Sequence, residues 1–159
     1  MGIGQSLRRD DAAGLVVVKR WQELFPVHVR DSDLFVEWVE LPGMALLDRL
    51  ESIEQLLIVD AVQSGGQPGC LYRLSEIEVA AFVQGSDSAH GWGIAETLAL
   101  GRRIQPERMP AFVDILGIEV KDVSFGEGLS AEVDAAIDAA AREIELWITT
   151  RGNGQGKEW

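Results

Sequence analysis

The chain contains only one cysteine, Cys70, so it cannot form an internal disulfide. Free thiols are typical of reducing compartments, and we therefore expect a cytoplasmic protein. No apolar run approaches the roughly 20 residues needed to cross a bilayer, and no secretory signal is recognisable after Met1. Taken together, these absences argue against disulfide-stabilised secreted domains and against membrane proteins.

Basic residues are also scarce: 14 Lys and Arg stand against 26 Asp and Glu, which gives a formal net charge of −12. Nucleic acids and anionic membrane surfaces are bound mainly through Lys and Arg, so we expect neither as a partner. The 159 residues and a hydrophobic content of 47% fit a single globular domain. We expect this domain to span residues 1–150, followed by a disordered glycine-rich tail at 151–159.

Motifs of several common enzyme classes are missing. There is no G-x-S-x-G, H-E-x-x-H or C-x-x-C, and Gly2-Ile3-Gly4 lacks the third glycine of a dinucleotide fingerprint because Leu7 stands there. Cys70 has no second soft ligand nearby, and we interpret it as a small buried hydrophobe. His28 lies before a predicted strand, where a surface position is expected.

The most informative stretch that is present is the apolar run Leu56–Val62, which contains one carboxylate, Asp60. Continuous runs of Val, Ile and Leu favour a strand buried on both faces of a parallel sheet. An unpaired buried carboxylate is costly, so Asp60 is expected where the strand emerges. Ligands of open α/β sheets bind at that edge. A plainer role also stays open, in which Asp60 only caps the following loop.

Helical and extended patterns alternate along the rest of the chain. We expect helices that start at Asp10–Asp11 and end at Pro26, and over 44–53, 75–83, 89–104 and from Ser130 onward, and strands over 34–39, 70–74 and 111–119. This order predicts an α/β fold, a three-layer α/β/α sandwich with a mostly parallel twisted sheet of about four to five strands, one of them antiparallel. The short 70–74 strand suits an antiparallel edge. Gly2-Ile3-Gly4-Gln5 looks like the turn after a strand, so the first strand is expected to be truncated. Either its missing part is encoded upstream, which we favour, or the domain has one strand fewer.

Three ligand-type side chains are brought toward one edge of the sheet by this topology. Asp11 lies in the first turn of a helix, Asp60 ends the central strand, and His90 is expected in the first turn of the helix capped by Ser88. Two carboxylates and an imidazole can form an open site for nickel, manganese or zinc. Asp11 as a helix-start charge and His90 as an exposed helix-start histidine remain alternatives.

At this point the sequence resembles the hydrogenase maturation endopeptidases along nearly the whole chain. The marks are Gly2 to Gly14, Leu57-Ile58-Val59-Asp60-Ala61, Pro68-Gly69, Ser88-Ala89-His90, Leu116-Gly117-Ile118-Glu119 and Gly128-Leu129-Ser130. None is decisive alone, but their order and spacing are fairly specific. Two departures are Gln5, where the family usually has Asn, and Ala89, where Pro often precedes the histidine.

The resemblance implies an aspartyl-type endopeptidase that removes the C-terminal extension of a nickel–iron hydrogenase large-subunit precursor after nickel insertion. It also implies that Asp11, Asp60 and His90 form the metal-recognition and catalytic site and that the nickel arrives with the substrate. Independently of the resemblance, we expect a monomer. Two other functions stay open: a non-catalytic binding module for the precursor, and an unrelated α/β protein that binds a small ligand at its acidic edge.

Overall fold

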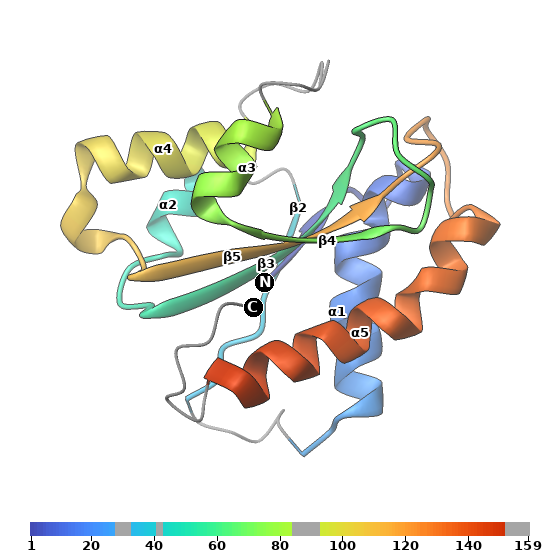
Figure 1. Cartoon of the computed structure of the whole chain (residues 1–159), viewed down its shortest axis with the longest axis horizontal. Helices are drawn as coiled ribbons and strands as arrows, with labels where there is room; N and C mark the ends of the chain where they lie inside the picture. Colours follow the sequence, from blue (N-terminus) through green and yellow to red (C-terminus); the bar gives the residue numbers. More distant parts are fainter. Residues whose placement is uncertain (28–32, 41–42, 84–92, 152–159) are drawn as a thin grey trace.

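A computed structural model describes residues 1–27, 33–40, 43–83 and 93–151 (Figure 1). Its five-stranded sheet has the order β2-β1-β3-β5-β4. The strands are β1 (Gly2–Gly4), β2 (Trp38–Glu40), β3 (Gln55–Val62), β4 (Leu71–Ser75) and β5 (Phe112–Glu119). All neighbours are parallel except β4, which runs antiparallel to β5. The predicted mixed sheet is confirmed, and the Asp60 strand is its middle strand.

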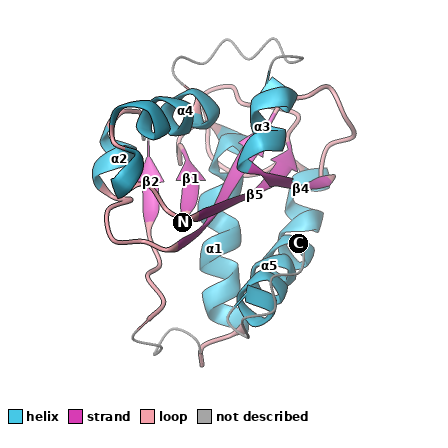
Figure 2. Cartoon of the chain, turned by 60° about the vertical axis from the view of Figure 1, so that its left-hand side comes forward, coloured by secondary structure: helices cyan, strands magenta, loops and turns pink. Residues whose placement is uncertain are grey.

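Helices cover both faces of this sheet and complete the three layers (Figures 1 and 2). The helices α1 (Ala13–Leu24) and α5 (Ala131–Arg151) lie on one face, and α2 (Ala45–Asp48), α3 (Glu76–Val83) and α4 (Ile94–Ile104) lie on the other. Two short 3₁₀ turns, η1 (Arg9–Ala12) and η3 (Pro106–Arg108), precede α1 and β5. Within the described ranges, no helix has the length and apolarity to span a bilayer.

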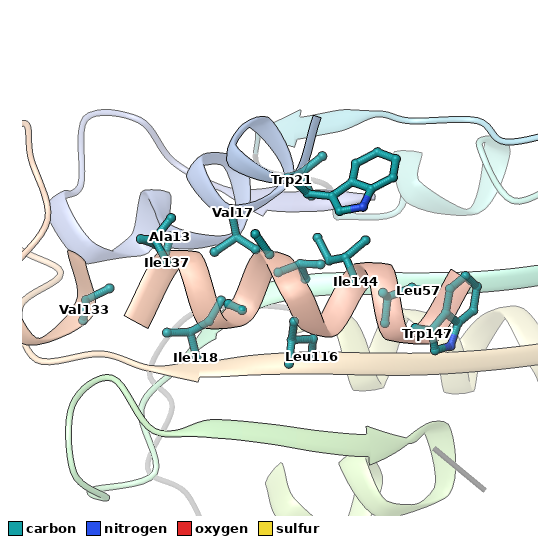
Figure 3. Close-up of a cluster of buried hydrophobic side chains, with 14 of the residues drawn as sticks. Ala13, Val17, Trp21, Leu57, Leu116, Ile118, Val133, Ile137, Ile144 and Trp147 are labelled. Carbon is teal, nitrogen blue, oxygen red and sulfur yellow. The ribbon is translucent and has the colours of Figure 1, made fainter. Parts of the chain in front are cut away.

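The middle strand β3 supplies apolar side chains to both layers, as its continuous apolar run predicts. Leu57 and Val59 pack toward α1 and α5, whereas Leu56 and Ile58 pack toward α2 and α4. Figure 3 shows the first of these clusters, in which side chains from α1, α5, β3 and β5 converge. The predicted apolar stripe of α5 is confirmed by its buried members Val133, Ile137, Ala140, Ile144 and Trp147.

Helix α1 lies unusually close to the sheet at Gly14. A Cβ added there would come within 2.3 Å of the carbonyl oxygens of both Ile3 and Val59, so only glycine permits this approach. The contact draws the start of α1 against β1 and β3. It thereby holds η1, which directly precedes α1, at the carboxyl edge of these two strands.

Several sequence expectations are corrected at the amino-terminal half of the sheet. The Gly2-Ile3-Gly4 stretch is not a turn after a missing strand but is itself strand β1, paired with β2 on one side and β3 on the other. The strand expected over 34–39 is regular only at Trp38–Glu40, because it pairs only with the three residues of β1. The helix expected over 44–53 is regular only from Ala45 to Asp48.

On the other side of the sheet one prediction is confirmed and one changes. Strand β4 is an antiparallel edge strand, as predicted, and it pairs with β5, which lies between it and β3. The helix expected over 89–104 begins at Ile94 in the structure, because Gly93 has an extended backbone at its N-cap. Of the tail predicted at 151–159, Arg151 is instead the last residue of α5, and residues 152–159 lie outside the described residues.

Candidate functional site

Asp60 lies near the carboxyl end of β3, where its side chain is half-buried. Its Oδ1 accepts a hydrogen bond of 2.9 Å from the backbone N–H of Ala61, so the loop-capping role considered from the sequence is partly realised. Burial raises the pKa of Asp60 from 3.8 to about 7, against the opposing effect of the Ala61 bond. The negative charge of Asp11 raises this pKa further.

Asp11 is held at the same edge by the η1 turn, in which its backbone N–H donates to the Arg8 carbonyl at 3.0 Å. The end of β1 makes room for it: a Cβ on Gly4 would lie 2.0 Å from the Asp11 carbonyl oxygen, and the φ of Gly4 is +155°. Glycine is therefore required where β1 turns into this loop. The structure thus brings two of the three predicted site residues together, each half-buried.

His90, the third predicted residue, lies outside the described residues. The described part of α4 begins at Ile94, so the position expected for His90 at a helix start stays a prediction. His28 likewise falls outside the described ranges. Its expected surface position stays a prediction.

Asp10 has a role that the sequence interpretation missed, since it was grouped with Asp11 as a helix-start charge. Its side chain is fully buried and receives four hydrogen bonds from the segment after β5. The donors are Lys121 N at 3.1 Å, Asp122 N at 3.0 Å, Ser130 N at 2.5 Å and Ser130 Oγ at 2.9 Å. Burial opposes ionisation, but these bonds outweigh it and lower the pKa of Asp10. Asp10 therefore ties the start of α1 to the loop before α5.

Glu119, the last residue of β5, organises a second loop at this edge. Its buried carboxylate accepts bonds from the loop after β3: from Ser64 N at 2.9 Å, Gly65 N at 3.0 Å, Gly66 N at 3.1 Å and Ser64 Oγ at 2.6 Å. A signal for it was present in the sequence, because Glu119, like Asp60, is a carboxylate near the carboxyl end of an apolar strand. Its carboxylate fixes the Gly-rich loop beside the site.

Cys70 is exposed, which overturns the prediction of a buried small side chain. The reason is local: the left-handed Gly69 (φ +86°) and the bond from Cys70 N to the Gln67 carbonyl make a tight turn just before the edge strand β4. Cys70 therefore contributes nothing to the core.

The donor set at this edge is compatible with a cation. No group of three or more His, Cys, Asp or Glu side chains arranged to hold a metal occurs within residues 1–27, 33–40, 43–83 and 93–151. Asp11 and Asp60 offer carboxylate oxygens, which bind divalent first-row cations when ionised. Two protein carboxylates leave most coordination positions of such a cation to other groups.

Comparisons with known proteins agree on one group. A family model described as hydrogenase maturation protease matches residues 41–147, a segment that contains positions 60 and 90 but begins after Asp11. The hydrogenase expression/formation protein HupD from Rhodobacter capsulatus is 30% identical over 154 residues, which cover 92% of this chain and 70% of that protein.

Solved structures show the same likeness. The hydrogenase maturating endopeptidase HybD from E. coli has a TM-score of 0.77 at 25% identity, covering 95% of this chain and 91% of that one. The [NiFe] hydrogenase maturation protease HybD from Thermococcus kodakarensis has a TM-score of 0.69 at 25% identity, covering 92% and 95%. Both similarities extend over nearly the whole of each chain.

Proposed function

This chain belongs to the hydrogenase maturation protease family, and from that premise we propose that it is the endopeptidase that removes the C-terminal extension of a nickel–iron hydrogenase large-subunit precursor. The observation that carries the proposal is the meeting of Asp11 and Asp60 at the carboxyl edge of the sheet, where burial, together with the charge of Asp11, raises the pKa of Asp60 to about 7. Perturbed carboxylates at such an edge are typical of functional sites. Family membership also removes the alternative of an unrelated α/β protein.

In this proposal the nickel arrives inside the precursor and is part of the substrate. Asp11, Asp60 and His90 sense it, and the nickel polarises the scissile carbonyl or activates a water molecule. Asp60 is suited to sensing because its pKa of about 7 leaves it partly protonated at neutral pH. A cation beside Asp60 and Asp11 favours the ionised form of both and relieves their mutual repulsion.

The test is cleavage of purified precursor, with and without nickel, by the wild type and by His90→Ala and Asp60→Asn. We expect the wild type to cut only nickel-loaded precursor and both variants to cut neither form. Asp48→Asn is the matched control, because Asp48 is an exposed aspartate at the end of α2, away from this edge. Normal cleavage by both site variants would contradict the assignment of these residues.

The same assay separates catalysis from simple binding. If the wild type binds nickel-loaded precursor without cutting it, the protein is a binding module and the endopeptidase proposal fails. We further propose that the protein acts as a monomer in the cytoplasm. The single cysteine supports this location, and size-exclusion chromatography tests the oligomeric state.

A further inference from the structure

Two large apolar side chains are exposed on the loops that frame the candidate site. Leu7 is 50% exposed just before η1, which carries Asp11, and Phe125 is 82% exposed on the loop after β5. In the described loops that follow β1, β3 and β5, no other large apolar side chain is exposed to this degree. Isolated exposed side chains are common, so their significance depends on whether they lie together.

Backbone hydrogen bonds place the segments that carry these two side chains next to each other. Gly126 N donates to the Leu7 carbonyl at 2.9 Å, and Arg9 N donates to the Gly126 carbonyl at 2.9 Å, which forms a parallel bridge between Arg8 and Gly126. Leu7 and Phe125 directly precede the two bridged residues, so their backbones lie side by side. Figure 1 shows the segment before α1 beside the loop that follows β5.

The polar groups around this pair are engaged within the protein. Arg8 Nε donates to the Val123 carbonyl at 3.1 Å, and Arg9 Nε lies 3.4 Å from the Asp122 carboxylate. The buried carboxylate of Asp10 ties together the same two segments. The surface therefore offers apolar contact on a backbone that is already ordered, which lowers the entropic cost of binding.

We propose that Leu7 and Phe125 form a docking surface for an apolar side chain of the precursor segment that carries the nickel. This inference rests on the proposed function, because nickel held near Asp11 and Asp60 requires the precursor to lie across this edge. The distance along the chain is short: Leu7 precedes Asp11 by four residues, and Asp11 N is bonded to the Arg8 carbonyl at 3.0 Å. The docking surface is thus continuous with the candidate site.

The test compares Leu7→Ser and Phe125→Ser with Phe35→Ser in cleavage of nickel-loaded precursor. Phe35 is a matched control, because it is 79% exposed but precedes β2 at the opposite end of the sheet. We expect each docking variant to raise KM roughly tenfold with kcat nearly unchanged, as for an apolar anchor at an interface. Phe125→Trp, which keeps a large apolar surface, should retain a KM close to that of the wild type.

Melting temperatures complete the design, since these exposed side chains contribute little to the fold and all variants should melt like the wild type. Unchanged KM in both docking variants, or an equal rise in Phe35→Ser, overturns the docking inference while leaving the endopeptidase proposal standing. Failure of the wild type to cut any nickel-loaded precursor instead overturns the proposed function, and the docking inference with it.

Discussion

Asp10 and Asp60 are two carboxylates withdrawn from water at the same edge of the sheet, and they are treated in opposite ways. Asp10 receives four hydrogen bonds from the segment after β5, and its pKa is lowered. Asp60 accepts a bond from its neighbour Ala61 and faces the charge of Asp11, and its pKa is raised to about 7. Burial is common to both, so the difference in pKa comes from the surrounding groups: hydrogen-bond donors stabilise the ionised Asp10, whereas the like charge of Asp11 disfavours the ionised Asp60.

The two aspartates therefore differ in role, one structural and one functional, although both lie at the same edge of the sheet. A carboxylate saturated by backbone and hydroxyl donors stabilises the fold and has little capacity left for another ligand. When a half-buried carboxylate lies beside a second one, its ionisation lowers the stability of the fold, and a bound cation can offset this loss by stabilising the ionised form. On this basis we assign a structural role to Asp10 and a role in metal recognition to Asp60.

The largest expected effect is on activity at Asp60. Replacing it by Asn removes a charge that Asn cannot supply to a cation, so cleavage of nickel-loaded precursor should fall on the order of a thousandfold, about 4 kcal/mol in the activation free energy. The measurement is the single-turnover cleavage rate. If the cleavage rate of Asp60→Asn lies within tenfold of the wild-type rate, Asp60 has no special role in metal recognition.

The next effect is on stability at Asp10. In Asp10→Asn the NH2 group of the new amide replaces one acceptor oxygen and faces N–H and O–H donors, from which it cannot accept. The free energy of unfolding should therefore drop by about 3 kcal/mol. The lowered pKa also makes this contribution depend on pH: it is complete above the unfolded value near 3.8 and is lost as pH falls through the lower folded value. Urea unfolding at pH 7 and at pH 3 measures both, and a variant that unfolds like the wild type at pH 7 would contradict the scaffold role.

A smaller effect of opposite sign is expected on the stability of Asp60→Asn. Because the pKa of Asp60 is raised on folding, its ionisation costs stability as pH rises from about 4 to 7, and the cost is complete above pH 7. The variant should therefore be more stable than the wild type at pH 8, on the order of 2 kcal/mol, with the gain fading toward pH 4. Thermal unfolding at the two pH values tests this, and a variant that loses stability at pH 8 speaks against a strained Asp60.

The smallest predicted effect is at Ser130, which donates one of the bonds to Asp10 through its hydroxyl. Ser130→Ala removes this bond and leaves the three backbone donors in place. We expect a loss of about 1 kcal/mol in the free energy of unfolding. If Ser130→Ala in an Asp10→Asn background still costs the same amount, the two residues are not coupled.

The long elements and the site edge were predictable from the sequence because their signals are local. The continuous apolar run of β3 and the helical stripe of α5 identify those elements, and parallel strands place Asp60 beside the loop of Asp11. The division of labour between Asp10 and Asp11 was not predictable. It depends on donors at Lys121, Asp122 and Ser130, which are more than a hundred residues away in sequence.

The short elements were hard to predict for a related reason. Strand β1 has three residues, all buried, so it shows no periodicity, and its glycines resemble a turn. Its strand character comes from pairing with β2 and β3, which lie far along the chain. The place of β5 between β3 and β4 is likewise a long-range choice that no local pattern encodes.

A carboxyl ¹³C NMR titration that resolves Asp10 and Asp60 in one protein tests their different roles most directly. We predict that Asp60 titrates near pH 7 and that Asp10 titrates below its ordinary 3.8. The Asp60 value should fall in Asp11→Asn, because the neighbouring charge is removed. Titration of both aspartates close to pH 4 would contradict the claim that one carboxylate belongs to the scaffold and the other is held ready for a metal.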